Sequence, residues 1–355
     1  MGGDDPLCNS RRISRLHSAR GVTKLSTLPA VLARFLVCLC AVGACSRPIA
    51  RARTSAIEPP SVHEIDAQDR LARKRCSGSL AYVPLIMGLG QYCHRKDAHA
   101  AALALAGFAD LATGIAVGTQ SEEGFANPAA AFALVAYQDV WVAGIADMLI
   151  DRDLARGRLY APTDNLGDLL AAPFNWEVMK QPKVWGAILG AVAIGVGVTV
   201  ALDGVPDASP TDDANLFGKN VSPALGYPGA MMAFGGLFSH VAPAEELMFR
   251  GVVQSGLARN YGENVGWVGG SLIFGAIHAP NAFALESGER RNYLTFALPV
   301  ITAVGSYLGY LYKDSEYSLA APTAMHFWYN TLLSATAFAL DPQNSPVSAN
   351  IGLRF

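Results

Sequence analysis

The stretch that decides the fold runs from Met231 to Val253 and reads MMAFGGLFSHVAPAEELMFRGVV. Two adjacent glutamates, Glu245 and Glu246, lie inside this apolar stretch, and Arg250 follows one helical turn later. A charged side chain at the depth of a bilayer costs roughly 2.5 to 3.5 kcal/mol on insertion scales. Because charged groups at that depth usually mark a pathway or an active site, the stretch predicts a buried polar site in a membrane protein.

The composition of the whole chain also indicates a membrane protein. The 355 residues are 51% hydrophobic and only 16% charged, whereas soluble domains carry about 25% charged residues. The net charge of -2 gives no basic surface that would favour nucleic acid as a partner. We therefore expect an all-α polytopic transmembrane helical bundle, since a spanning backbone must satisfy its own hydrogen bonds.

The sequence contains eight candidate spans, one of them short, so we expect about seven to eight crossings. The candidates are Leu80–Tyr92, Ala98–Gly118, Pro128–Ile150, Val184–Leu202, Leu225–Leu257, Val265–Phe283, Tyr293–Tyr312 and Ala321–Leu340. A further run, Leu166 to Lys180, mixes apolar residues with charge, which favours a helix lying on the membrane surface. Basic loops on one side and the acidic loop Asp203–Ser222 on the other predict the orientation.

The N-terminus has the pattern of a targeting segment. Basic residues precede the apolar run Phe35 to Ala44, and Val42-Gly43-Ala44 has the small residues of a signal cleavage site. Cys45 follows directly, so an acylated lipoprotein cysteine is one alternative, and an uncleaved anchor is another. A signal of this style favours a bacterial inner membrane as the location.

Local signals predict how the charged stretch is arranged. Pro243 favours a helix start, because the N–H that proline lacks has no partner in the first turn. Glu245 and Glu246 would then lie in that first turn, where the helix dipole favours negative charge. Glu246 and Arg250 are four residues apart and can pair on one face. Glu245 points about 100° away from Glu246 and is free for other chemistry.

Two later apolar segments carry further polar side chains. Phe274-Gly275-Ala276-Ile277-His278 ends one segment, and His326-Phe327-Trp328-Tyr329-Asn330 opens the last. His326 and Asn330 are four residues apart and share a helix face. A carboxylate can activate water as a base, imidazoles can bind a metal or move protons, and an amide can donate to an oxyanion. Together these groups suit hydrolytic chemistry, provided that the three segments converge.

The three motifs, in this order, resemble the signatures of the CPBP superfamily of intramembrane proteases. That superfamily includes the type II CAAX prenyl endopeptidases and bacterial Abi-type proteins, and its signatures are EExxxR, FxxxH and HxxxN. They stand here at Glu245–Arg250, Phe274–His278 and His326–Asn330, and the resemblance covers roughly residues 165 to 340. The resemblance implies a CPBP-like helical core and an endopeptidase that cleaves a membrane-associated protein or peptide.

The resemblance also implies a role for each motif residue. The catalytic residues would be Glu245, His278, His326 and Asn330. Glu245 would activate the water and Asn330 would donate to the oxyanion, while Glu246 and Arg250 would support the motif helix. A divalent metal such as zinc could be held by His278 and His326, as in a metalloprotease. Since a metal-bound Glu245 could not act as a free base, we expect it to be the base.

Two other function classes remain open from the sequence. A non-catalytic CPBP-like membrane protein could act in binding or in immunity to a peptide toxin. An ion or proton carrier could use Asp110, Asp139 and Glu245 as a relay, since intramembrane carboxylates mark such paths. The complete motif set favours the enzyme, because a binding scaffold does not need all four polar groups.

On this interpretation the chain divides into four parts. Residues 1–45 form a signal or anchor segment and 46–78 a polar linker, followed by N-terminal membrane helices over 79–160 and the CPBP-like protease domain over 161–345. The expected partners are the lipid bilayer and a membrane-associated substrate. A prenylated substrate, which eukaryotic relatives suggest, is not carried over, since a bacterium offers no obvious prenylated protein.

Overall fold

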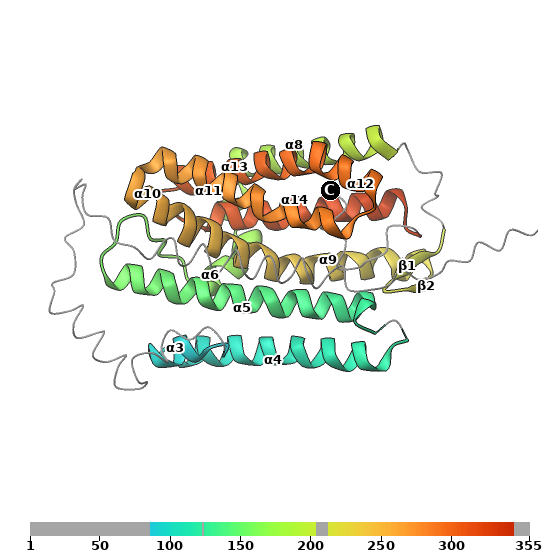
Figure 1. The fold of residues 1–355 in the computed structure, drawn as a ribbon, viewed down its shortest axis with the longest axis horizontal. Coiled ribbons are helices and arrows are strands. Elements are labelled where there is room, and N and C mark those ends of the chain that lie inside the picture. Colours follow the sequence, from blue (N-terminus) through green and yellow to red (C-terminus); the bar gives the residue numbers. More distant parts are fainter. Residues whose placement is uncertain (1–85, 123, 204–211, 344–355) are drawn as a thin grey trace, which may run out of the picture.

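The structure, a computed structural model, describes residues 86–122, 124–203 and 212–343 (Figure 1). The expected signal segment, Cys45 and the polar linker lie outside these residues. Apart from turns and connecting loops, the described part is helical except for one antiparallel hairpin, formed by β1 (Ala214–Leu216) and β2 (Lys219–Val221). The fold is therefore an all-α bundle, as the composition predicts.

Seven long helices form the bundle within the residues that the structure describes. They are α4 (Asp97–Gln120), α5 (Pro128–Ala155), α8 (Pro182–Asp203), α9 (Pro223–Glu246), α11 (Glu263–His278), α13 (Leu298–Asp314) and α14 (Ala320–Leu340). Helix α4 packs on α5, α5 on α9, α9 on α14 and α14 on α8, while α11 packs against α13 (Figure 1). Helices α9, α11 and α14 carry the glutamates and the two histidines of the three motifs, and α9 and α14 pack directly against each other.

Short elements connect these helices. They are α3 (Leu89–Cys93), η2 (Gly124–Ala126), α6 (Leu166–Ala171), η3 (Ala172–Phe174), α7 (Trp176–Met179), the π-helix η4 (Leu247–Gln254), α10 (Ser255–Tyr261), η5 (Ala279–Ala284), α12 (Ser287–Asn292) and the π-helix η6 (Tyr293–Ala297). Single π-helical turns inside longer helices occur frequently at functional sites. Here η4 contains Arg250 of the first motif. The other π-helix, η6, begins with Tyr293, which contacts His278 of the second motif.

Within the described ranges, three helical segments are long and apolar enough to cross a membrane. They are Asp97–Gln120, Pro128–Leu154 and the continuous run Ser287–Asp314 made by α12, η6 and α13, and Pro182–Val198 is a shorter apolar helix. These segments confirm a membrane helical bundle. The expected number of crossings and their orientation stay predictions.

The expected helix start at Pro243 is wrong. Helix α9 begins at Pro223 and continues through Pro243, so Glu245 and Glu246 lie at its C-terminal end, directly before η4. The apolar face of α9 explains the difference, because Phe234, Phe238 and their neighbours pack in one core cluster with α14. Burial of that continuous face outweighs the local preference of proline for a first turn.

The run from Leu166 to Lys180 is not the single helix that was expected. It forms α6, η3 and α7, and Asn165 and Asn175 cap α6 and α7 with their side chains. Pro173 in η3 lacks the N–H that a continuous helix would need. Phe174 and Trp176 are exposed between these short helices. Their position at a membrane surface stays a prediction.

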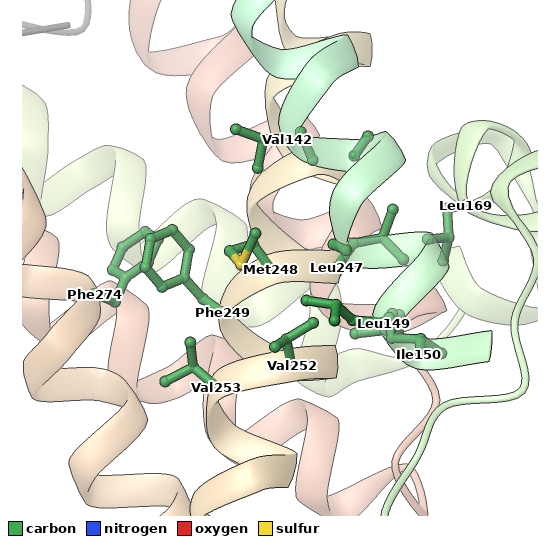
Figure 2. Packing of buried hydrophobic residues seen from close by; sticks show 14 of the residues in the cluster. Val142, Leu149, Ile150, Leu169, Leu247, Met248, Phe249, Val252, Val253 and Phe274 are labelled. Atoms are coloured by element: carbon green, nitrogen blue, oxygen red, sulfur yellow. The ribbon is translucent and has the colours of Figure 1, made fainter. Parts of the chain in front are cut away.

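The largest core cluster fixes the segment that follows the two glutamates. Leu149 and Ile150 of α5 pack against Leu247 and Val252 of η4, as Figure 2 shows. On the other side, Phe249 meets Phe274 of α11 edge to face, with ring centroids 5.1 Å apart (Figure 2). Each fully buried side chain of this size contributes about 1.5 to 3 kcal/mol. The π-helix η4 is thus held between α5 and α11.

Candidate active site

Two imidazoles, from two different helices, lie close to one carboxylate oxygen of a third helix. His278 Nε2 and His326 Nε2 each lie 3.9 Å from Glu245 Oε2. Glu245 is the last but one residue of α9, His278 ends α11, and His326 lies early in α14. The side chains are 17%, 12% and 6% exposed, in that order. The structure thus brings together the residues that the separate motifs single out.

Hydrogen bonds to the other ring nitrogens fix which atoms face Glu245. His278 Nδ1 lies 2.7 Å from the carbonyl oxygen of Phe274, and His326 Nδ1 lies 2.8 Å from Glu246 Oε1. Both oxygens accept, so each Nδ1 donates its hydrogen. In the neutral imidazoles, each Nε2 therefore presents a lone pair to the carboxylate. Three acceptor atoms close to one another require a donor or a cation between them, and either a water molecule or a metal ion would meet that need.

Glu246 is fully buried and receives two hydrogen bonds on one oxygen. Its Oε1 accepts from Arg250 Nη1 at 3.0 Å and from His326 Nδ1. Arg250 is itself 2% exposed and donates from Nη2 to the carbonyl of Gly305 at 2.7 Å. Its guanidinium lies 4.4 Å from the centre of the Phe274 ring. The predicted pair of Glu246 and Arg250 is confirmed, and it also orients His326.

Asn330 lies one helical turn after His326 on the same face of α14 and is half-buried. An amide in this position can reach a group that is bound beside the imidazole, because residues four apart on a helix are neighbours. The part of Asn330 in the site stays a prediction.

Residues 228–332 match the family model described as type II CAAX prenyl endopeptidase Rce1-like. The matched range contains all three motifs and runs from α9 into α14. This part of the chain is an Rce1-like domain of the CAAX protease family. The family is one of proteases, which implies a peptide or protein substrate, and the apolar helices of the chain support a membrane protein. No curated protein and no solved structure matches the chain.

The spacing around Glu245 in the Rce1-like domain is wider than that of two ligands on one zinc ion. Across residues 86–122, 124–203 and 212–343, no group of three or more His, Cys, Asp or Glu side chains is arranged to hold a metal. Zinc bonds of about 2.0 to 2.2 Å in a tetrahedral site hold two such ligand atoms about 3.4 Å apart. The distances from Glu245 Oε2 to the two imidazoles are wider, at 3.9 Å. Zinc at His278 and His326 stays a prediction, and no step below depends on it.

Two contacts of the Rce1-like domain have no counterpart in the sequence motifs. Glu246 reaches His326 eighty residues away, and the Tyr293 hydroxyl donates to the main-chain carbonyl of His278 at 2.9 Å. Neither contact has a local spacing signal, because each joins residues of different helices. Only the apolar setting of Tyr293, in Tyr293–Tyr312, could have drawn attention to its hydroxyl.

The carboxylates outside the Rce1-like domain lie on the N-terminal helices. Asp110 of α4 lies within electrostatic range of His240 of α9, and Asp139 of α5 is buried. Asp147 is also buried and accepts a hydrogen bond from Gln91 Nε2 at 3.1 Å. A relay that includes Asp110 and Asp139 stays a prediction.

Proposed function

We propose that the protein is an intramembrane endopeptidase in which Glu245 activates a water molecule. The observation that carries this proposal is the convergence of Glu245 with two imidazoles whose Nε2 lone pairs face it at 3.9 Å. The membership of residues 228–332 in a protease family supports the same reaction class. The substrate would be a membrane-associated protein or peptide, because the site lies among apolar helices.

The reaction begins with the water that the three acceptors hold. Glu245 removes one proton from this water, while an imidazole Nε2 accepts a hydrogen bond from its other hydrogen. The water oxygen then attacks the carbonyl carbon of the peptide bond, and the carbonyl oxygen becomes an oxyanion. The Asn330 amide donates to that oxyanion. Glu245 returns its proton to the leaving nitrogen, the C–N bond breaks, and a new carboxyl group and amine are released.

Glu246 and Arg250 support this chemistry without touching the substrate. Glu246 Oε1 accepts the Nδ1 hydrogen of His326 and so keeps the Nε2 lone pair directed toward Glu245. Arg250 neutralises the buried carboxylate and ties it to Gly305 of α13. The arrangement resembles the use of a buried carboxylate to hold a catalytic imidazole in one tautomer, as in serine proteases.

Substitution of Glu245 tests the proposal. The purified protein in detergent is assayed for cleavage of a peptide library, and the Glu245→Gln variant is compared with Glu263→Gln. Glu263 is a matched control because it begins α11 and is exposed. We expect Glu245→Gln to lower the rate by about 10²- to 10⁴-fold and Glu263→Gln to leave it unchanged. Cleavage that survives in Glu245→Gln would overturn the glutamate mechanism.

The same preparation also separates the other possibilities. Metal content and the effect of a chelator on the cleavage rate decide whether an ion takes part at His278 and His326. A protein that cleaves no peptide but still binds one, with Glu245→Gln binding equally well, would instead indicate the non-catalytic function.

A further inference from the structure

We propose that Tyr293, held by Asn281, is a positioning residue for the imidazole of His278. The Tyr293 hydroxyl donates to the His278 carbonyl at 2.9 Å, and Asn281 Nδ2 donates to the Tyr293 hydroxyl at 3.3 Å. Both side chains are buried, Tyr293 at 3% exposure and Asn281 at 0%. This proposal rests on the proposed function, because the contacts are taken to position an imidazole that is catalytic only if that function holds.

The carbonyl of His278 lies where α11 passes into the next helix. His278 is the last residue of α11 and the N-cap of η5, so its carbonyl already accepts the first hydrogen bond of η5. A carbonyl oxygen has two lone pairs, and the Tyr293 hydroxyl donates a second hydrogen bond to it from fifteen residues further along the chain. The final turn of α11 is therefore also held by a side chain from outside the helix.

The final turn of α11 also sets the direction of the His278 imidazole. His278 Nδ1 donates to the carbonyl of Phe274, which belongs to the same turn, and the two rings lie 4.6 Å apart. If the turn opens, Nδ1 loses its acceptor and the ring is free to rotate. His278 Nε2 would then leave its place beside Glu245 Oε2. The Tyr293 hydroxyl thus acts on the imidazole through the helix end.

Tyr293 is itself placed by a cap on the chain that leaves α11. Arg290 of α12 donates from Nε to the carbonyl of Ala282 and from Nη2 to that of Leu285, both at 3.0 Å. These bonds join α12 to the end of η5. Tyr293 begins the π-helix η6 directly after α12. The cap therefore holds the hydroxyl against His278.

A tyrosine elsewhere in the bundle provides a matched control. Tyr307 of α13 also donates its hydroxyl to a main-chain carbonyl, that of Lys183, and its distance is also 2.9 Å. This bond joins α13 to α8 and makes no contact with the three clustered side chains. If the Tyr293 hydroxyl had only a structural role, its removal would therefore have the same effect on the protein as removal of the Tyr307 hydroxyl.

The first experiment compares Tyr293→Phe with Tyr307→Phe in the full chain. We expect Tyr293→Phe to lower kcat about tenfold or more, since small misplacements of catalytic groups have effects of this size, with KM and the melting temperature matching those of Tyr307→Phe. Tyr307→Phe should keep the wild-type kcat. Equal kcat values in the two variants would overturn the proposal. Asn281→Leu, which removes the donor to Tyr293, should lower kcat in the same direction.

The second experiment does not depend on cleavage. Protein labelled with ¹⁵N-histidine reports the ring tautomer of His278 by NMR, with His278→Gln used to assign its signals. We expect the Nδ1-protonated form in the wild type and in Tyr307→Phe, and a mixture with the Nε2-protonated form in Tyr293→Phe. Unchanged His278 signals in Tyr293→Phe would overturn the positioning role even in an active protease. Cleavage retained by Glu245→Gln would instead defeat the proposed function, while the tautomer result still decides on Tyr293.

Discussion

At the scale of single residues, one oxygen atom of Glu246 serves two partners. Its Oε1 accepts a hydrogen bond from Arg250, which stabilises the buried pair, and another from His326, which orients the imidazole ring. These two functions respond differently to substitution, because a buried ion pair can be replaced without loss of stability only if both charges are removed together.

A double substitution separates the two functions. Glu246→Gln alone leaves Arg250 as an uncompensated buried charge and should lower the free energy of unfolding by about 3 to 5 kcal/mol. Adding Arg250→Met should recover most of that stability, but the cleavage rate should stay low because His326 has still lost its charged acceptor. Melting temperature and cleavage rate are measured on the same samples. A double variant that regains activity together with stability would show that Glu246 has no role in orienting His326.

The amide of Asn330 gives a second prediction at this scale. Asn330 is half-buried, so its truncation should leave the packing largely intact. We expect Asn330→Ala to lower kcat by about 10²- to 10³-fold, the effect of losing one oxyanion donor, with little change in KM or melting temperature. A variant with normal kcat would remove Asn330 from the site.

At the scale of elements, close approach between α11 and α13 supports the site. A Cβ added at Gly305 would lie 2.4 Å from Cδ1 of the Phe274 ring. The carbonyl of the same glycine accepts from Arg250 Nη2, so α13 must stay close to both α11 and η4. Glycine at this position is therefore a packing requirement of the motif helices.

Alanine at two glycines tests this requirement. Gly305→Ala should destabilise the protein by about 1 to 3 kcal/mol through overpacking and should lower activity by displacing Phe274. Gly190→Ala in α8, where nothing lies within 4 Å of the added Cβ, should instead raise stability by roughly 0.5 to 1 kcal/mol. The melting temperature of each variant is compared with that of the wild type. Equal shifts of the melting temperature in the two variants would argue against a close contact at Gly305.

At the scale of the whole molecule, the N-terminal helices and the Rce1-like domain share one core. Ile150 and Leu149 of α5 pack in the same cluster as Leu247 and Val252 of η4. A Cβ at Gly251 of η4 would lie 2.5 Å from the Ile150 side chain. Helix α5 thus supports the segment that carries Arg250, although it lies outside the range matched by the family model.

Truncation of a side chain on α5 tests this shared core. Ile150→Ala should lower the free energy of unfolding by about 2 to 5 kcal/mol, because it opens a cavity against η4. The control is Leu105→Ala on α4, which is 72% exposed and should change stability by less than about 0.5 kcal/mol. Unfolding in detergent is followed for both variants. Similar losses in the two would indicate that α5 is not part of the core of the Rce1-like domain.

The sequence by itself determined the features that depend on neighbouring residues along one helix. Apolar runs predicted the helical bundle, and the spacing of Glu246 and Arg250 predicted their pairing, because a period of 3.6 residues places positions four apart on one face. The three motifs also named Glu245, His278 and His326, which the structure brings together.

Only the tertiary structure decided the features that depend on which helices touch. The passage of α9 through Pro243, the bond from His326 to Glu246 and the bond from Tyr293 to His278 each follow from contact between separate elements. Periodicity reports which face of a helix is apolar, but it carries no information about the side chain that the neighbouring helix presents to that face. Packing of the whole bundle selects those partners, because burial of the continuous apolar faces outweighs local preferences such as that of proline for a helix start.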